Sequence, residues 1–228
     1  MSNTSRMHTG KQSKRTLQPV IRIHQTPQAV VRIVPRGGSR TAAQMQEQWK
    51  YLSRRGEVKL QRSERHLGVF LSTEQIAETA ASWVEQASTK GGDVDDKEVQ
   101  ELTTHIVISF PKGTEYAKAF AAGRAWAEEM FGSGRNGGSF DYLTACHSDR
   151  PHPHIHLVVN RRALEGHWLK ISRRDTWHNY QKMRSTMVDV ARRYGIELEA
   201  TSRAQRGINE LPITYAVYRR HSRNINND

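Results

Sequence analysis

Two segments rich in β-branched and apolar residues, FDYLTACH (140–147) and HIHLVVNRR (154–162), stand on either side of a short polar stretch. Their composition predicts two strands, and the stretch between them is short enough for a tight connection. Strands joined so closely pair antiparallel, because parallel pairing needs a long crossover. We therefore expect an antiparallel sheet at the centre of the fold.

Four of the eleven histidines of the chain fall in the decapeptide HSDRPHPHIH, where these strands meet. Alternate side chains of a strand share a face, so His152, His154 and His156 point the same way if the strand begins that early. Pro153 cannot donate to a strand ladder, which favours a later start. Residues four apart on a strand are about 13 Å apart, whereas a histidine nitrogen binds a divalent ion at about 2 Å. We therefore predict that His154 and His156 share a metal ion with His147 of the facing strand.

Three neutral imidazoles with open coordination positions favour Mn²⁺, Zn²⁺, Co²⁺ or Ni²⁺ over Mg²⁺ on grounds of ligand softness. Open positions would accept oxygen atoms of a substrate. His152 would then either support the ligands from outside the coordination shell of the metal or contact DNA. The alternative is that these rings cap turns and face solvent.

The charge of the chain predicts a polyanionic partner. The net charge is +12 with a pI near 10.1, and it is divided into +11 over residues 1–66, −5 over 67–135 and +6 over 136–228. Nucleic acid fits this pattern better than a membrane, because no basic amphipathic helix with a strong apolar face is evident. The sequence contains no run of about 18 apolar residues, so no membrane-spanning helix is expected. The single cysteine, Cys146, suits the reducing cytoplasm of a cell.

The remaining patterns mix helices and strands without strict alternation, which predicts an α+β fold with helices packed on the antiparallel sheet. Further strands are expected at 29–35 and 104–111. Residues 90–100 are expected to form an acidic loop, and the glycine-rich 132–139 a mobile one. Helices are expected over 42–56 after a cap at Ser39 or Thr41, over 71–88 with a Ser72–Gln75 capping box, over 113–132, over 175–195 with Asp175 as N-cap, and over 212–222.

A nucleophile for phosphodiester chemistry is suggested by Tyr51, which lies in the basic stretch WKYLSRRGEVKLQRSER. A packing tyrosine on an amphipathic helix is an equal alternative. Cys146 precedes His147 on its strand, so it faces away from the metal and is expected to be a small packing residue. Single-stranded bases could stack on Trp49, Trp168 or Trp177, although tryptophan more often belongs to the core.

The chain resembles the HUH-type conjugative relaxases of the MOBP-like class, and among them the border-nicking group of T-DNA transfer in plant-transforming bacteria. The resemblance rests on five stretches in the same order over roughly residues 28–222, namely YLSRRG, THIVISFPKGTE, HPHIHLVVNRR with the upstream HSD, WLKISRRDTWHNY and RGINELPITYAVYRR. Residues 1–27 form a basic arm outside it, expected to be flexible, and 223–228 form a tail. The chain departs from close relatives at Pro151, where they have an acidic residue.

The resemblance implies a palm-like antiparallel sheet with His147, His154 and His156 holding a divalent ion, Mn²⁺ or Mg²⁺. It implies that Tyr51 attacks a phosphodiester of single-stranded border or transfer-origin DNA and stays joined to the 5′ end. Asp149 and His152 are candidate bases. An accessory DNA-processing protein, a type IV secretion coupling protein and export with the DNA into a recipient cell are also implied. The residues expected to contact DNA are Lys50, Arg54, Arg55, Lys59, Arg62, Arg65, Arg150, Arg161, Arg162, Arg173 and Arg174.

Three other functions remain open at this point. A rolling-circle replication initiator or a transposase would use the same chemistry on another DNA site. A DNA-binding module could hold a structural metal with the same histidines, although structural zinc sites are usually closed and rich in cysteine. A metal-dependent nuclease that activates water would leave no protein on the DNA.

Overall fold

The computed structural model describes residues 26–88, 100–172, 174, 176–202 and 205. Its central feature is a six-stranded antiparallel sheet in the order β1-β4-β6-β5-β2-β3. The strands are β1 Val30–Ile33, β2 Leu60–Arg62, β3 Phe70–Leu71, β4 Thr103–Ser109, β5 Tyr142–His147 and β6 His154–Asn160. The predicted α+β class and the antiparallel centre are confirmed.

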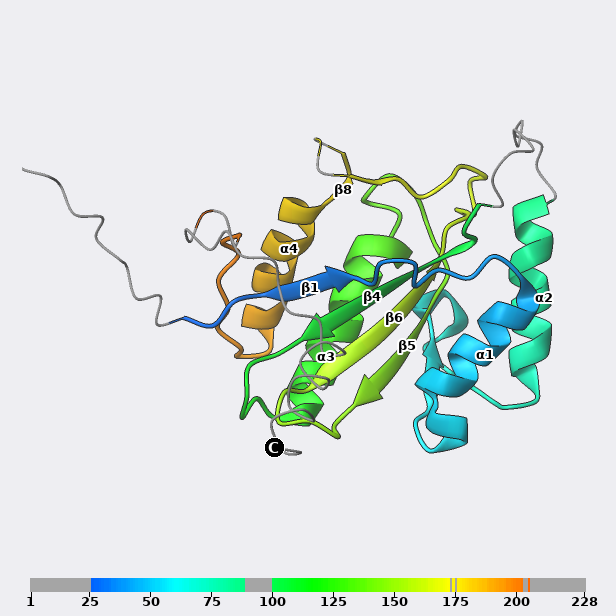
Figure 1. Ribbon diagram of the computed structural model, residues 1–228. Coiled ribbons are helices and arrows are strands. Elements are labelled where there is room, and N and C mark those ends of the chain that lie inside the picture. Colours follow the sequence, from blue (N-terminus) through cyan, green and yellow to red (C-terminus); the bar gives the residue numbers. More distant parts are fainter. Residues whose placement is uncertain (1–25, 89–99, 173, 175, 203–204, 206–228) are drawn as a thin grey trace, which may run out of the picture.

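Within the residues that the structure describes, four helices pack against the sheet (Figure 1). They are α1 Ala42–Leu52, α2 Gln75–Ser88, α3 Tyr116–Ala127 and α4 Tyr180–Arg193. Short helical turns η1 Arg54–Gly56, η2 Glu64–His66 and η3 Glu128–Gly132 extend the connections, and β7 Ile171–Ser172 pairs in parallel with β8 His178–Asn179.

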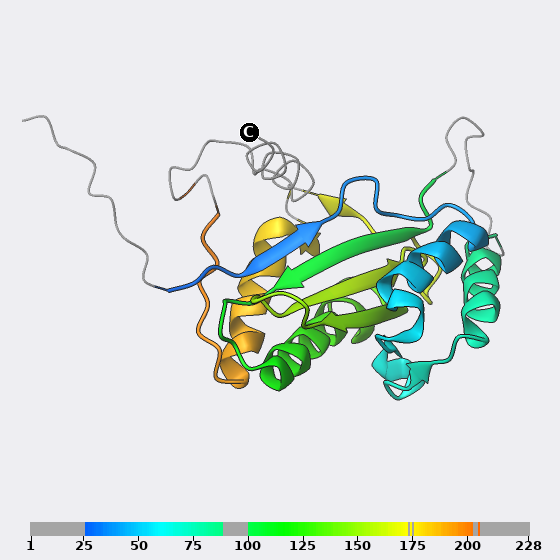
Figure 2. The ribbon, with the colours of Figure 1, turned by 60° about the horizontal axis from the view of Figure 1, so that its bottom comes forward.

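Alternation along β6 divides the core into two. Ile155, Leu157 and the other odd-numbered side chains enter a cluster that includes Trp126 of α3 and Met187 of α4. Val158 enters a second cluster with residues of α1, α2 and β2 on the opposite face. Figure 2 shows α3 and α4 together along one side of the sheet, with α1 and α2 beside β5. The even-numbered face of β6 therefore carries the histidines.

Local signals account for most helix starts. Thr41 caps α1, its side chain accepting a hydrogen bond from the Gln44 amide at 3.2 Å. Ser72 and Gln75 form the expected reciprocal capping box at 3.0 and 3.4 Å. Helix α1 ends at Leu52, four residues before Gly56, and the chain continues as the turn η1.

The predicted start of the last long helix was wrong. The helix α4 begins at Tyr180, and Asn179 caps it by accepting a hydrogen bond from the Lys182 amide at 2.7 Å. Tertiary packing delays the helix, because the buried His178 ring stacks on Phe131 and its Nε2 lies 2.9 Å from the Met130 carbonyl oxygen. The predicted N-cap, Asp175, lies outside the described residues.

The glycine-rich segment 132–139 has more structure than its composition suggests. It closes as a turn with a bridge between Gly134 and Gly138, and the buried Asn136 donates to the Glu129 carbonyl at 2.7 Å. Several other predictions fall wholly or almost wholly outside the described residues: the arm up to residue 25, the acidic loop over 90–100 apart from its last residue, the helix over 212–222 and the tail 223–228. The domain limits 28–222 therefore stay a prediction.

Candidate metal centre and nucleophile

The three predicted histidines form one cluster at the end of the β5–β6 hairpin. His147 and His154 are direct partners in the strand register, and His156 follows on the same face. The ring centroids of the three pairs are 4.7 to 5.3 Å apart. Each ring offers one nitrogen, and these nitrogens lie within 4.8 Å of one another. Ile155 points into the opposite core, as expected.

The separation suits a shared ion. Two nitrogens that each bind a divalent ion at about 2.1 Å can be at most about 4.2 Å apart. The cluster would therefore close on an ion by small ring rotations. The donor set of three imidazoles suggests a metal site without identifying its metal.

The second nitrogen of each ring already has a partner. His147 Nε2 lies 2.8 Å from the carbonyl oxygen of Leu52, and His154 Nδ1 lies 3.2 Å from that of His152. A carbonyl can only accept, so each of these nitrogens carries the proton and the other nitrogen keeps its lone pair for a metal. His156 Nδ1 lies 2.9 Å from Nε2 of a fourth imidazole, His105.

His105 was missed by the sequence interpretation. It lies on β4, where its partner is Val158 and the partner of Val107 is His156, so the contact with His156 is diagonal. The available signal was a polar residue alternating with the apolar Ile106 and Ile108 in THIVISFP. The contact itself joins residues 51 positions apart, which no local pattern encodes.

The four rings are held neutral by burial. Desolvation lowers the pKa of His105 to about 4 and that of His156 to about 3. The pKa values of His147 and His154 are also lowered, mainly by burial. Neutral imidazole is the metal-binding form, so the cluster is ready to bind a cation at neutral pH.

The predicted nucleophile lies on the helix end that contacts this cluster. Tyr51 is 78% exposed in the last turn of α1, and the Leu52 carbonyl bonded to His147 is on the next residue. A second link comes from Arg54 of η1, whose guanidinium contacts the Asp149 carboxylate at 2.5 Å in the β5–β6 connection. An outward tyrosine has no packing role, which disfavours the core alternative.

The two candidate bases differ in their surroundings. The ion pair with Arg54 opposes the effect of burial and holds the pKa of Asp149 below its usual range. His152 is exposed, and its Nδ1 lies 3.3 Å from the Phe110 carbonyl oxygen, which leaves Nε2 as the acceptor. Cys146 faces away from the cluster, as predicted, and burial raises the pKa of its thiol to about 11.

The predicted DNA contacts fall into three groups. Those exposed at the surface are Lys50, Arg55, Lys59, Arg150 and Arg174, of which Lys50 also pairs with Glu47 and Lys59 lies over Phe70. Those that are half-buried or held by other side or main chains are Arg54, Arg62, Arg65, Arg161 and Arg162. Arg173 lies outside the described residues.

Two of the engaged arginines have structural surroundings that disfavour the predicted role. Arg162 is only 4% exposed and lies over the Trp168 ring. Arg161 donates to the carbonyl oxygens of Glu101 and Leu169, both at 3.3 Å. Of the tryptophans considered for base stacking, Trp49 is fully buried, which makes that assignment wrong.

Comparison with known proteins places these features in a family. Residues 51–196 match the family model described as relaxase, MobA/VirD2-like, nuclease domain. The T-DNA border endonuclease VirD2 of Rhizobium rhizogenes is 56% identical over 198 residues, which cover 86% of this chain and 45% of that protein. The protein of the same name from Agrobacterium fabrum (strain C58) is 55% identical, with 86% and 44% covered.

The chain thus spans about half the length of the curated relatives it matches. A solved structure described as "Molecular Basis of Vancomycin Resistance Transfer in Staphylococcus aureus" aligns with a TM-score of 0.46 at 12% identity, covering 77% of this chain and 99% of that one. Within the part of the chain that the structure describes, no helix is long and apolar enough to cross a bilayer.

Proposed function

Because the chain belongs to the MobA/VirD2-like relaxase family, we propose that it nicks one strand of DNA by attack of Tyr51 on a phosphodiester. The observation that carries this proposal is the bond between His147 and the Leu52 carbonyl at 2.8 Å. It joins a three-histidine cation site to the end of the helix that presents an exposed tyrosine. A nucleophile beside a Lewis-acid site is what phosphoryl transfer requires.

The proposed reaction exchanges one phosphate ester for another. The Tyr51 phenol oxygen forms a bond to the scissile phosphorus while the bond from phosphorus to the 3′ oxygen breaks. The 5′ end becomes a phosphotyrosine, and the departing 3′ oxygen takes up a proton to give a free 3′-OH. The bond energy is retained, so the reverse reaction can rejoin the strand without a cofactor. An ion held by His147, His154 and His156 would polarise a non-bridging phosphate oxygen and offset its growing charge.

Loss of the phenol proton needs an acceptor, because a free phenol has a pKa near 10. His152 is the better of the two predicted candidates. Its Nε2 is left with a lone pair, whereas the Asp149 carboxylate is occupied by Arg54. Asp149 would then act by holding Arg54, and with it the turn after Tyr51, against the histidine hairpin.

The substrate class follows from the relatives and from charge. The relatives are named for T-DNA borders, so we propose single-stranded border or transfer-origin DNA, bound by exposed cations such as Lys50, Arg55 and Arg150. We further propose that an accessory DNA-processing protein opens the duplex. A type IV secretion coupling protein would then receive the protein, which is exported with the attached strand.

Covalent capture tests the function directly. The protein is incubated with Mn²⁺ and a single-stranded border oligonucleotide labelled on the 3′ side of the cut, and the mixture is run on a denaturing protein gel. We expect a labelled protein band that EDTA abolishes. Tyr51→Phe removes only the hydroxyl and should abolish the band while keeping DNA binding. Tyr194→Phe, directly after α4, is the matched control and should retain it.

The other outcomes separate the alternatives. Cleavage without a labelled band would indicate a nuclease that activates water. A band that persists in Tyr51→Phe would exclude this nucleophile. Binding without cleavage in the presence of Mn²⁺ would favour a DNA-binding module with a structural metal. Preference for a replication origin over border sequences would favour an initiator.

A further inference from the structure

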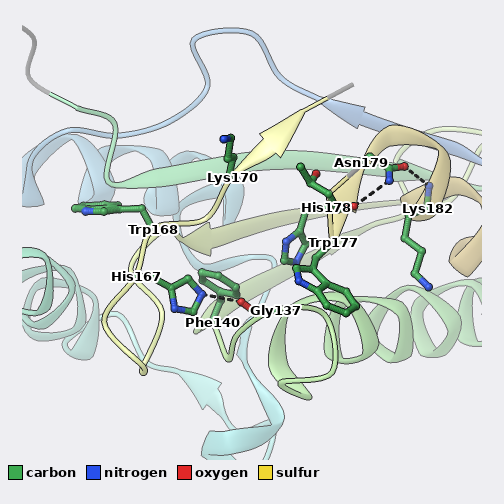
Figure 3. A pocket seen from close by; sticks show the side chains of 10 residues that line it. Gly137, Phe140, His167, Trp168, Lys170, Trp177, His178, Asn179 and Lys182 are labelled. Carbon is green, nitrogen blue, oxygen red and sulfur yellow. Dashed lines mark hydrogen bonds between the residues drawn. The ribbon is translucent and has the colours of Figure 1, made fainter. Parts of the chain in front are cut away.

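A second hollow lies away from the histidine cluster, around β7 and β8 (Figure 3). Its volume is about 640 Å³, within the range of small-molecule sites. The side chains that give it its chemistry are Phe140, His167, Trp168, Trp177, Lys170 and Lys182. We call these six residues the aromatic pocket. They come from separate connections of the chain, so the pocket exists only in the folded protein.

Trp177 is the unusual member of the aromatic pocket. It is 63% exposed, whereas Trp49, Trp83 and Trp126 are buried in the cores. Most of the ring therefore faces water, and exposed aromatic platforms serve single-stranded nucleic acid binding. Trp177 lies in the chain just before the strand β8, whose buried His178 fixes the local backbone.

The glycine-rich turn packs against the rings of Trp177 and His167. A Cβ on Gly137 would come within 2.4 Å of the Trp177 ring, and one on Gly138 within 2.5 Å of His167 Nε2. Both glycines have positive φ angles, 75° and 145°. His167 Nε2 also lies 2.7 Å from the Gly137 carbonyl oxygen (Figure 3). The two glycines therefore let both rings lie close against the backbone.

The charge around the aromatic pocket favours a polyanion. Lys170 and Lys182 line it and are exposed, and none of the described residues that line it is an Asp or Glu. Aromatic faces together with mobile cations match the bases and phosphates of a single strand. An apolar partner would gain nothing from the two lysines.

The position of the aromatic pocket is compatible with the strand cut at the histidines. The histidines begin β6, whereas Trp168 pairs with Arg162 beyond its far end. Seven strand residues at about 3.3 Å each put the two regions about 20 Å apart, which is about six stacked nucleotides and fewer extended ones.

A smaller hollow has lining residues next to both sites. Its volume is about 190 Å³, and it is lined by His105, which contacts His156, and by Leu169 and Ile171. Lys170, between these last two residues, lines the aromatic pocket instead. The segment 169–171 therefore lies between the two hollows and contributes to both.

We propose that the aromatic pocket binds unstacked bases of the DNA strand that is cut at the histidine site, with Trp177 as the stacking surface and Lys170 and Lys182 on the phosphates. This site rests on the proposed function, since it takes the same strand. It would add affinity outside the cleavage site and fix which flanking nucleotides are recognised.

The test compares two oligonucleotides with the same central cleavage site, one of about 24 nucleotides and one of about 6, whose three nucleotides on either side of the cut are too few to reach the aromatic pocket. Binding is measured by fluorescence anisotropy in the Tyr51→Phe protein. Trp177→Ala should weaken binding of the long oligonucleotide by roughly 5- to 150-fold and leave the short one unchanged. Trp177→Tyr, which keeps a stacking face, should recover most of the loss.

Charge and contact are tested in parallel. Lys182→Gln should reduce the salt dependence of long-oligonucleotide binding, whereas Arg192→Gln, at the far end of the same helix, should not. Single 5-iodouracil bases placed along the long oligonucleotide should crosslink to Trp177 from one or two adjacent positions. The Trp177 variants should keep the thermal midpoint of the parent, because the side chain is exposed.

The outcomes are distinguishable. If the wild type forms the covalent product but Trp177→Ala binds both oligonucleotides like the parent, the aromatic pocket proposal fails alone. If the wild type binds neither oligonucleotide, both proposals fail. If an acidic peptide binds the protein and loses affinity in Trp177→Ala, while the long oligonucleotide does not, the pocket is a protein-docking site. The proposal is then overturned.

Discussion

At the scale of single residues, His105 determines which nitrogen of His156 faces the cluster. The 2.9 Å contact joins His105 Nε2 to His156 Nδ1. If His156 is to bind a cation through Nε2, its proton must be on Nδ1, and His105 must accept that proton's hydrogen bond. His105 is thus a positioning residue that fills the role a carbonyl plays for His147 and His154.

Replacing His105 should therefore weaken metal binding. We expect His105→Phe to lower Mn²⁺ affinity about 10- to 100-fold, measured by calorimetry on metal-free protein. His105→Gln can still accept a hydrogen bond and should recover part of the affinity. His167→Phe removes an imidazole elsewhere and is the control. Equal Mn²⁺ affinity for His105→Phe and wild type, both folded, would show that His156 needs no such partner.

At the scale of elements, one buried carboxylate attaches the β2–β3 region to the hairpin. Asp141, just before β5, is 4% exposed and accepts hydrogen bonds from Arg65 Nε at 3.0 Å and Ser63 Oγ at 3.1 Å. Burial opposes ionisation, yet the bonds and charge of Arg65 hold the pKa of Asp141 below its usual value. The predicted DNA contact Arg65 therefore has a structural role.

Removing that partner should cost stability more than DNA affinity. Arg65→Gln leaves the Asp141 charge poorly compensated, and we expect a loss of about 1–3 kcal/mol in the free energy of unfolding. Arg55→Gln removes the same charge from an exposed position and should change stability by less than about 0.5 kcal/mol. Urea unfolding of both variants provides the measurement. If Arg65→Gln is as stable as wild type but loses DNA affinity, the original assignment as a phosphate contact is restored.

These elements also show how far local sequence patterns reach. The hairpin strands, the Ser72–Gln75 capping box and the three clustered histidines were predictable because each signal lies within a few residues. The start of α4 was not, because burial of His178 against Phe131 overrides the helical pattern. The His105–His156 contact, the Asp141–Arg65 bond and the aromatic pocket join residues far apart in the chain. Burial of Arg162 was likewise invisible in a count of basic residues.

At the scale of the whole molecule, the two apolar cores lead us to expect a fold that forms without an ion. Two apolar cores on opposite faces of the sheet support α1 with α2 and α3 with α4. The histidine cluster lies at one end of the hairpin, outside both apolar cores, and contacts the end of α1. Chelation at neutral pH should therefore abolish nicking while leaving the protein folded. This distinguishes a catalytic site from a structural metal, whose removal usually unfolds a small domain.

The metal-free protein should lose stability in acid. His105, His147, His154 and His156 all have pKa values below the unfolded value near 6.5. Below pH 6.5 the unfolded chain therefore binds protons that the folded chain does not, and the unfolding free energy falls as the pH falls. Each such proton costs up to about 1.4 kcal/mol per pH unit, from near 6.5 downwards to the folded pKa.

Urea unfolding at pH 7.5 and 5.5 in EDTA measures this slope. In separate samples without EDTA, Mn²⁺ should raise the free energy of unfolding more at pH 7.5 than at pH 5.5, because protons compete with the ion for the imidazoles. A His105→Gln protein should show a shallower slope than wild type, since one buried imidazole is gone and its replacement does not titrate. Equal stability of the metal-free wild type at the two pH values would mean that the four imidazoles have the same pKa values in the folded and the unfolded chain. Their burial would then not be what keeps them neutral for the metal.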